Sequence, residues 1–238
     1  MFRTFVDMFK NKDIRNRIFF TLAMLFVFRF GTAITVPGVD VAELTKGIQN
    51  SSLFAMINML GGGGLEQLSI FAMGVGPYIT ASIIIQLLTV ALPPLERLAK
   101  EGGEEGRKKI AQITRYVTVA LGFVMAVGII LSLGSQAFLD GNPTWFEYMV
   151  VFLSLAGGTA FSMWIGERIT ENGIGNGISM ILFAGIISRL PAMVGTMTTL
   201  AWWIDLIVVV GMLALIVFIV FINDAERRIP IQYALTYP

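Results

Sequence analysis

Long apolar stretches alternate with short polar segments along most of the chain. Most of these stretches approach the ~20 residues that an α-helix needs to cross the hydrocarbon core of a bilayer. The pattern predicts six transmembrane helices, at about residues 18–36, 77–92, 116–139, 147–167, 178–195 and 205–224. Turn-forming sequences such as Pro37-Gly38 and Pro93-Pro94 separate them. We therefore expect an all-α polytopic membrane protein, built as a bundle of helices.

The region 53–92 departs from this pattern, because glycine interrupts its apolar residues twice. Four consecutive glycines occupy positions 61–64, and Gly74-Val75-Gly76-Pro77 follows a second short apolar piece. Pieces of this length are too short to span a bilayer, and irregular backbone at membrane depth is tolerated only where it lines a cavity or is buried in protein. The region is interpreted either as a re-entrant element or as an ordinary loop before a helix.

Composition supports the membrane assignment and excludes several kinds of chemistry. Of the 238 residues, 55% are hydrophobic and only 14% are charged, whereas a soluble globular domain carries about 25% charged residues. The chain has no Cys and no His, which removes disulfides, thiolate nucleophiles, Ser–His dyads and His-based zinc motifs. We expect no catalytic residue, no metal site, no cofactor and no enzymatic activity.

The basic residues are distributed unevenly between the predicted loops. With the N-terminus in the cytoplasm, the cytoplasmic segments hold fourteen Lys and Arg, five of them in residues 1–17 and six in residues 95–115. The external loops hold one, Lys46. Because Lys and Arg are enriched in cytoplasmic loops, we predict a cytoplasmic N-terminus. Residues 1–17 are then a cytoplasmic amphipathic segment, and residues 95–115 a cytoplasmic loop.

Two arginines are the only charged residues well inside predicted spans: Arg29 and Arg189. Intramembrane charges are functional candidates by default. Each arginine is interpreted either as an anchor, which snorkels or pairs with backbone carbonyls, or as a contact for a substrate. No carboxylate lies in the middle of a predicted span, and this weakens the case for an ion- or proton-coupled transporter.

Several segments resemble the SecY family of bacterial protein-conducting channels. The run from Ser69 to Leu88, SIFAMGVGPYITASIIIQLL, is similar to the second transmembrane segment of that family. Further similar segments follow the family's order, at residues 36–40, 101–110, 173–179 and 227–234. The resemblance implies a channel that passes unfolded polypeptides across the bacterial plasma membrane or releases them laterally into it.

The resemblance also implies roles for individual residues. A plug comprises Leu65, Glu66, Gln67, Leu68, Ser69, Ile70 and Phe71. A pore ring of aliphatic side chains, above the plug, comprises Val75, Ile79, Ile178 and Leu182. Within each pair the spacing is i, i+4, which places both side chains on one helix face. A lateral gate includes Thr80, Ile83, Gln86 and Leu87, and Arg227 and Arg228 begin a segment that docks a cytoplasmic partner.

The same resemblance implies a division of the chain and a set of partners. The family has ten spans in two inverted halves, so residues 18–195 correspond to the first half, 196–223 to a sixth span and 224–238 to the start of a cytoplasmic loop with an atypical end. The implied partners are SecE-like and SecG-like small membrane subunits, a SecA-type motor ATPase or a ribosome, secretory and membrane-protein nascent chains, and a C-terminal half of the channel. A broken-helix secondary transporter, which also uses half-helices and glycine breaks, is the alternative.

Overall fold

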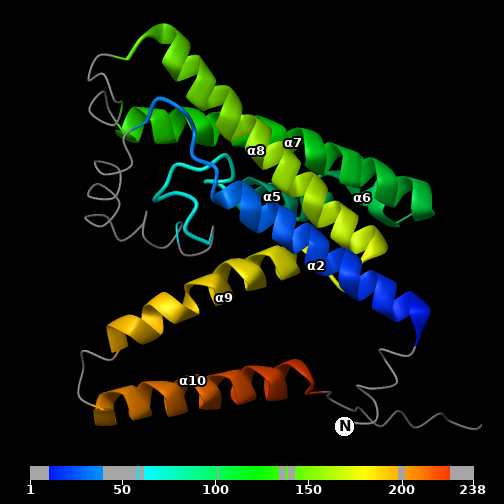
Figure 1. Ribbon diagram of the computed structural model, residues 1–238. Helices are drawn as coiled ribbons and strands as arrows, with labels where there is room; N and C mark the ends of the chain where they lie inside the picture. The colour runs from blue at the N-terminus through cyan, green and yellow to red at the C-terminus, as the bar shows by residue number, and fades with distance from the viewer. Residues whose placement is uncertain are drawn as a thin grey trace, which may run out of the picture. The chain divides into compact units, whose positions relative to one another are not determined.

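The computed structural model describes residues 11–39, 58, 62–100, 102–133, 138, 143–197 and 202–225. The helices in these ranges are α2 (Lys12–Thr32), α5 (Gly76–Ala91), α6 (Pro93–Lys100), α7 (Gly103–Leu133), α8 (Trp145–Asn172), α9 (Gly177–Met197) and α10 (Trp202–Asn223) (Figure 1). Within the described residues the extended contacts are two isolated β-bridges. The all-α prediction is confirmed. The chain divides into two compact units, Met1–Arg189 and Leu190–Pro238.

Each predicted span coincides with a helix, although the helix bounds differ from the predicted ones. By length and composition, three described helices can each cross a bilayer: Gly103–Leu131, Trp145–Asn172 and Leu206–Asn223. The pair α5 and α6 forms a fourth candidate, bent by 100° at the break between them. The protein is therefore a helical membrane protein, and the number of six crossings stays a prediction.

The charged segment 95–115, expected as a cytoplasmic loop between two spans, is helical over residues 95–100 and 103–115. Its cytoplasmic location stays a prediction. α6 begins at Pro93, directly after α5, and α7 begins at Gly103, which has a φ of +52° that favours glycine. A Cβ at Gly106 would meet the carbonyl oxygen of Leu98, so the two helices approach closely only because this residue is glycine. Glu104 and Glu105 lie in the first turn of α7, where the helix dipole favours negative charge.

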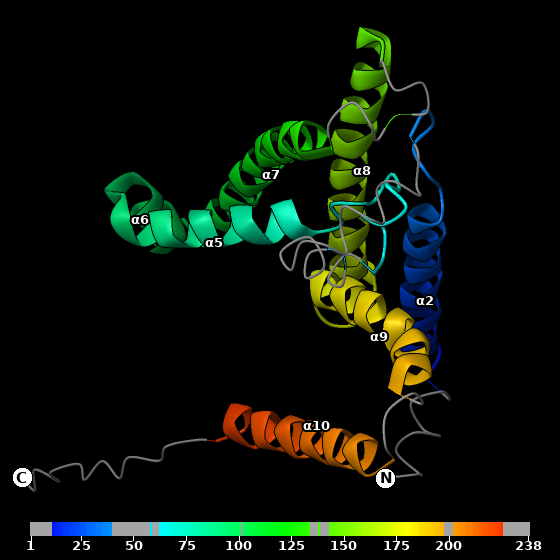
Figure 2. The ribbon, with the colours of Figure 1, turned by 90° about the vertical axis from the view of Figure 1, so that its left-hand side faces the viewer.

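The first unit combines a helix pair with a second group of helices that extends away from it. α2 and α8 lie side by side, and α7 packs against α8 (Figure 1). Figure 2 shows α5, α6 and α7 grouped together and extending away from α2 and α8. This arrangement leaves the start of α5 next to the α2–α8 pair and its far end away from them.

The segment 62–75 lies inside the first unit as a series of turns. Its backbone pairs with the residues that follow α2: Val36 N donates to Leu68 O at 3.0 Å, and Ile70 N donates to Ile34 O at 3.0 Å. Apolar side chains from the segment enter two buried clusters, one with Val151 and Leu155 of α8 and one with residues of α2, α8 and α9. The irregular backbone is thus largely buried in protein, which is the condition under which such backbone is tolerated at membrane depth.

The turn between α8 and α9 is tied to α2, and this fixes where α9 begins. Ile174 N donates to Thr21 Oγ1 at 3.1 Å, and Arg17 Nη1 donates to Gly173 O at 3.4 Å. Gly177 N, at the start of α9, donates to Thr170 Oγ1 at 2.9 Å. These contacts place the first turns of α9 beside α2 and α8, where two of the predicted ring residues lie.

Candidate functional site

The predicted plug, residues 65–71, is largely buried. The exposed fraction is 2% for Leu65, 0% for Leu68 and Ser69, and 4% for Phe71. Glu66 and Ile70 are half-buried, and Gln67 is exposed. Burial of this kind suits a segment held inside the fold rather than a solvated loop.

Leu68 adopts a left-handed backbone conformation, with a φ of +37°. Among the described residues it is the one non-glycine residue with a positive φ, a conformation that costs a non-glycine residue about 1–3 kcal/mol. Its N–H donates to Leu65 O at 3.1 Å, and its side chain is completely buried. Burial of the leucine side chain and these backbone bonds therefore hold a strained turn in place at the centre of the segment.

The four predicted ring residues meet at one apolar cluster, which also contains Phe71 of the predicted plug. Val75 is a buried member of the cluster, and Ile79, Ile178 and Leu182 pack against it. Val75 is the N-cap of α5, one residue before the helix begins at Gly76, and its side chain joins the same cluster as that of Ile79. The first turn still forms, because Ile79 N donates to Val75 O at 3.1 Å.

Aromatic stacking holds Phe71 between α2 and α8. Its ring stacks on Phe28 with a centroid distance of 5.4 Å and on Phe161 with a distance of 5.7 Å. A Cβ at Gly31 would meet the Phe71 ring, and a Cβ at Gly158 would meet the backbone oxygen of Ile70. Sequence reasoning missed Phe28, Phe161 and Gly31 as partners, since each is an unremarkable residue of an apolar span and only the tertiary fold brings it to the plug.

Both arginines that lie within predicted spans contact the segment that contains the predicted plug. Arg29 Nη1 donates to Gly62 O at 2.7 Å and to Thr32 Oγ1 at 3.4 Å. Arg189 Nη2 forms an ion pair with Glu66 Oε2 at 2.6 Å. Of the two interpretations of these arginines, the contacts are those of an anchor: a backbone carbonyl for Arg29 and a carboxylate for Arg189.

The predicted lateral-gate residues lie along α5. Ile83 and Leu87 are exposed by 52% and 65%, and the Gln86 side chain is also exposed. Thr80 is half-buried, and its hydroxyl donates to Gly76 O at 3.2 Å, so this polar group is satisfied within its own helix. These positions leave the face open to a further helix, and the gate role stays a prediction.

Some predicted positions lie outside the described residues. These are Arg227 and Arg228, with the rest of residues 226–238, and residues 1–10 of the predicted amphipathic segment. Their roles stay predictions.

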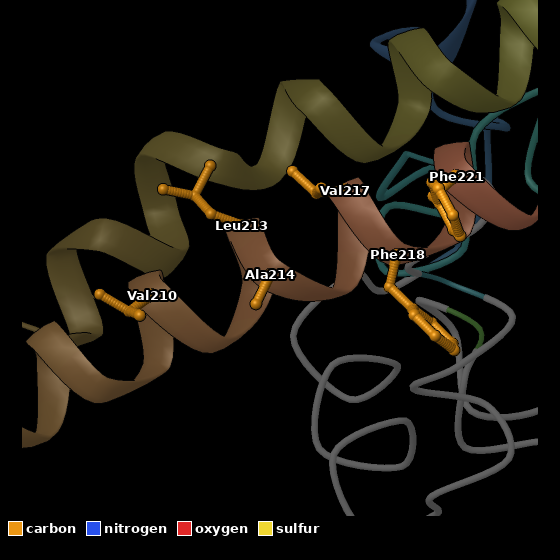
Figure 3. Close-up of a pocket in the computed structure, with 6 residues that line it drawn as sticks. All are labelled: Val210, Leu213, Ala214, Val217, Phe218 and Phe221. Atoms are coloured by element: carbon orange, nitrogen blue, oxygen red, sulfur yellow. The ribbon is translucent and has the colours of Figure 1, made fainter.

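The second unit contains α10, whose described side chains are apolar and exposed from Leu206 to Ile222. Figure 3 shows six of them along a shallow apolar groove on the helix: Val210, Leu213, Ala214, Val217, Phe218 and Phe221. A helix that is apolar all round is typical of a membrane span, which agrees with the predicted sixth span.

A sequence model of the SecY family matches residues 69–237 of the chain. The chain is 43% identical to the protein translocase subunit SecY of Staphylococcus carnosus (strain TM300) and 44% identical to that of Bacillus subtilis (strain 168). In both cases 98% of this chain aligns with 57% of the relative. The chain therefore spans a little over half the length of these relatives.

Two solved structures are similar in fold. One is the structure of a protein conducting channel, with a TM-score of 0.53 and 24% identity over 74% of this chain and 36% of that one. The other is Sec61 in the canine ribosome-channel complex from the endoplasmic reticulum, with a TM-score of 0.61 and 21% identity over 91% of this chain and 49% of that one. At these identities the likeness shows the fold alone.

Proposed function

The chain belongs to the SecY family, and from this membership we propose that it forms the N-terminal part of a channel for unfolded polypeptides. The channel passes these polypeptides across the bacterial plasma membrane or releases them laterally into it. The observation that carries the proposal is the single apolar cluster that unites Phe71 with Val75, Ile79, Ile178 and Leu182. This cluster supports a closed state in which the plug packs against the ring.

The chemistry of the ring suits this task. Aliphatic side chains at a constriction disfavour water and ions. They also offer no hydrogen bonds to a passing chain, so a polypeptide of any sequence can cross without being retained. Transport of this kind needs no catalytic group on the chain itself, because a partner supplies the energy.

The proposed partners follow from the same membership. A SecA-type motor ATPase or a ribosome would bind on the cytoplasmic side, near Arg227 and Arg228, and SecE-like and SecG-like subunits would pack within the membrane. One of the two solved structures that are similar in fold, Sec61, is seen in a ribosome-channel complex. A polypeptide corresponding to the remaining part of the relatives would supply the other side of the lateral gate, opposite the exposed residues of α5. A secondary transporter is not favoured.

Coexpression with this remaining part tests the proposal. We expect the chain alone to be inactive, because it spans only 57% of its relatives. We expect the combined polypeptides, reconstituted into vesicles with a motor ATPase and its ATP, to move a secretory preprotein into the lumen, where protease no longer reaches it. Uptake of a small solute without any protected preprotein would contradict the proposal and support a transporter.

Orientation is tested by single cysteines in this Cys-free chain. The fourteen-to-one distribution of Lys and Arg predicts that residue 100 faces the cytoplasm and residue 142 the exterior. In intact cells, a membrane-impermeant maleimide is expected to label Asn142→Cys and not Lys100→Cys. The reverse labelling pattern would overturn the proposed cytoplasmic N-terminus, and permeabilised cells control for the reactivity of each site.

A further inference from the structure

We propose that Arg29 and Arg189 are positioning residues that fasten the plug in its closed position, with Glu66 as the counter-charge. The inference rests on the proposed function of residues 65–71 as a plug, and it extends that function by naming what holds the plug in place. Two helices supply the contacts, α2 through Arg29 and α9 through Arg189.

The two arginines contact the same short stretch of backbone. Arg29 binds the carbonyl of Gly62, while Arg189 lies against Gly63 and reaches Glu66 three residues later. The side chains of the ion pair are only partly exposed, 27% for Arg189 and 33% for Glu66. Partial removal from water strengthens such a pair relative to one on an open surface, so loss of one partner leaves a poorly solvated charge on the other.

The glycines before the plug make this contact possible. Gly62 and Gly63 have φ values of +68° and +91°, which side chains other than glycine rarely adopt. A Cβ at Gly63 would lie 2.7 Å from Arg189 Nη2, and one at Gly62 would lie 3.1 Å from the Cα of Gly185 in α9. Gly62 and Gly63 therefore form a close-fitting surface for the arginines and α9. In the sequence these two glycines indicate only an interruption of an apolar stretch.

Polar contacts of this kind suit a part that must leave its position and return. Apolar packing alone would hold the segment through Phe71 and Leu68, but the strained φ of Leu68 opposes that packing. The arginine contacts add a directional hold that also sets the register of the segment, because a guanidinium binds its acceptors in a fixed geometry. Neutralising Glu66 or Arg189 is then expected to raise the population of the displaced plug.

A single cysteine inside the plug measures this population. Ser69 is completely buried, and its hydroxyl has no hydrogen-bond partner within the described residues, so Ser69→Cys removes no hydrogen bond. We would label this cysteine with a maleimide in the full chain in membrane vesicles. Glu66→Gln and Arg189→Gln are each expected to increase the labelling rate roughly tenfold. Loss of a hydrogen bond to a charged group shifts an equilibrium constant by about this factor, here the equilibrium between the seated and the displaced plug. Exchanging the charges, with Glu66→Arg and Arg189→Glu together, is expected to restore slow labelling.

A second ion pair provides the matched control. Arg115 Nε and Glu167 Oε1 lie 2.7 Å apart and join α7 to α8. Glu167→Gln removes a pair of similar length and is expected to leave labelling at residue 69 unchanged. Thr118→Cys, at a completely buried position of α7, reports whether a variant unfolds as a whole.

The outcomes separate this inference from the proposed function. Unchanged labelling in both neutral variants, or failure of the charge exchange to slow it, would overturn the positioning role. Equal acceleration at residue 118 would also overturn it, because the effect would then be global unfolding. Labelling reports the position of the plug without any transport. The transport assay can therefore fail while the labelling results support the positioning role, and transport can succeed while the labelling results overturn that role.

Discussion

Replacing Gly158 by alanine is expected to destabilise the first unit by about 3 kcal/mol, because overpacking against a backbone atom leaves no side chain that can move aside. A Cβ at this position would meet the carbonyl oxygen of Ile70, whose own N–H is bonded to Ile34 O. The new methyl group therefore pushes the plug segment away from both α8 and the residues after α2. The measurement is thermal unfolding of the full chain in detergent.

The neighbouring glycine is the control for this prediction. Gly157 lies on the same helix and is exposed, and a methyl group added to it would meet no atom within 4 Å. Gly157→Ala is expected to leave the unfolding midpoint unchanged, or to raise stability by up to about 1 kcal/mol through better helix propensity. Equal destabilisation by the two substitutions would show that Gly158 is not in contact with the plug.

The helices were predictable because long apolar runs have few alternatives in a membrane. The helical conformation of residues 95–100 and 103–115 was not predictable from the local sequence. Clustered charges and glycines favour a loop when only local sequence is considered, whereas in the structure Gly102, Gly103 and Gly106 allow α6 to turn closely onto α7. The decisive contact is the close approach of Gly102 and Gly106 to the carbonyl oxygen of Leu98. The pattern of apolar and polar residues in the sequence does not indicate this contact.

The candidate site was predictable in part. Arg29 and Arg189 stand out in the sequence as charges within apolar runs, yet the partner of Arg189 lies 123 residues away along the chain. Similarly, Val75 at the start of α5 and Ile178 in α9 lie far apart in the sequence. Only the resemblance to a known family relates the two positions before the structure is considered. Phe28 and Phe161, which stack on Phe71, have no distinguishing signal at all, because any phenylalanine in a span has the same local pattern.

The ring offers the prediction with the largest effect on function. Ile79→Asn and Leu182→Asn are each expected to make a complete channel leak ions at rest. Both side chains pack against the cluster that contains Phe71 and Val75, and an amide there lacks hydrogen-bond partners unless water enters. A loss of about 2 kcal/mol in this packing shifts the ratio of closed to open channels roughly thirtyfold. Planar-bilayer conductance without a translocating chain measures the leak.

Val90→Asn is the matched control, since Val90 lies on the same helix as Ile79 but is 80% exposed and has no predicted role. It is expected to conduct no more than the unmodified channel. The ring variants should also export substrates with defective signal sequences, because a weakened closed state needs less binding energy from the signal sequence to open. If conductance and export in both ring variants match those of Val90→Asn, then Ile79 and Leu182 are ordinary core residues, and the plug closes against some other part of the channel.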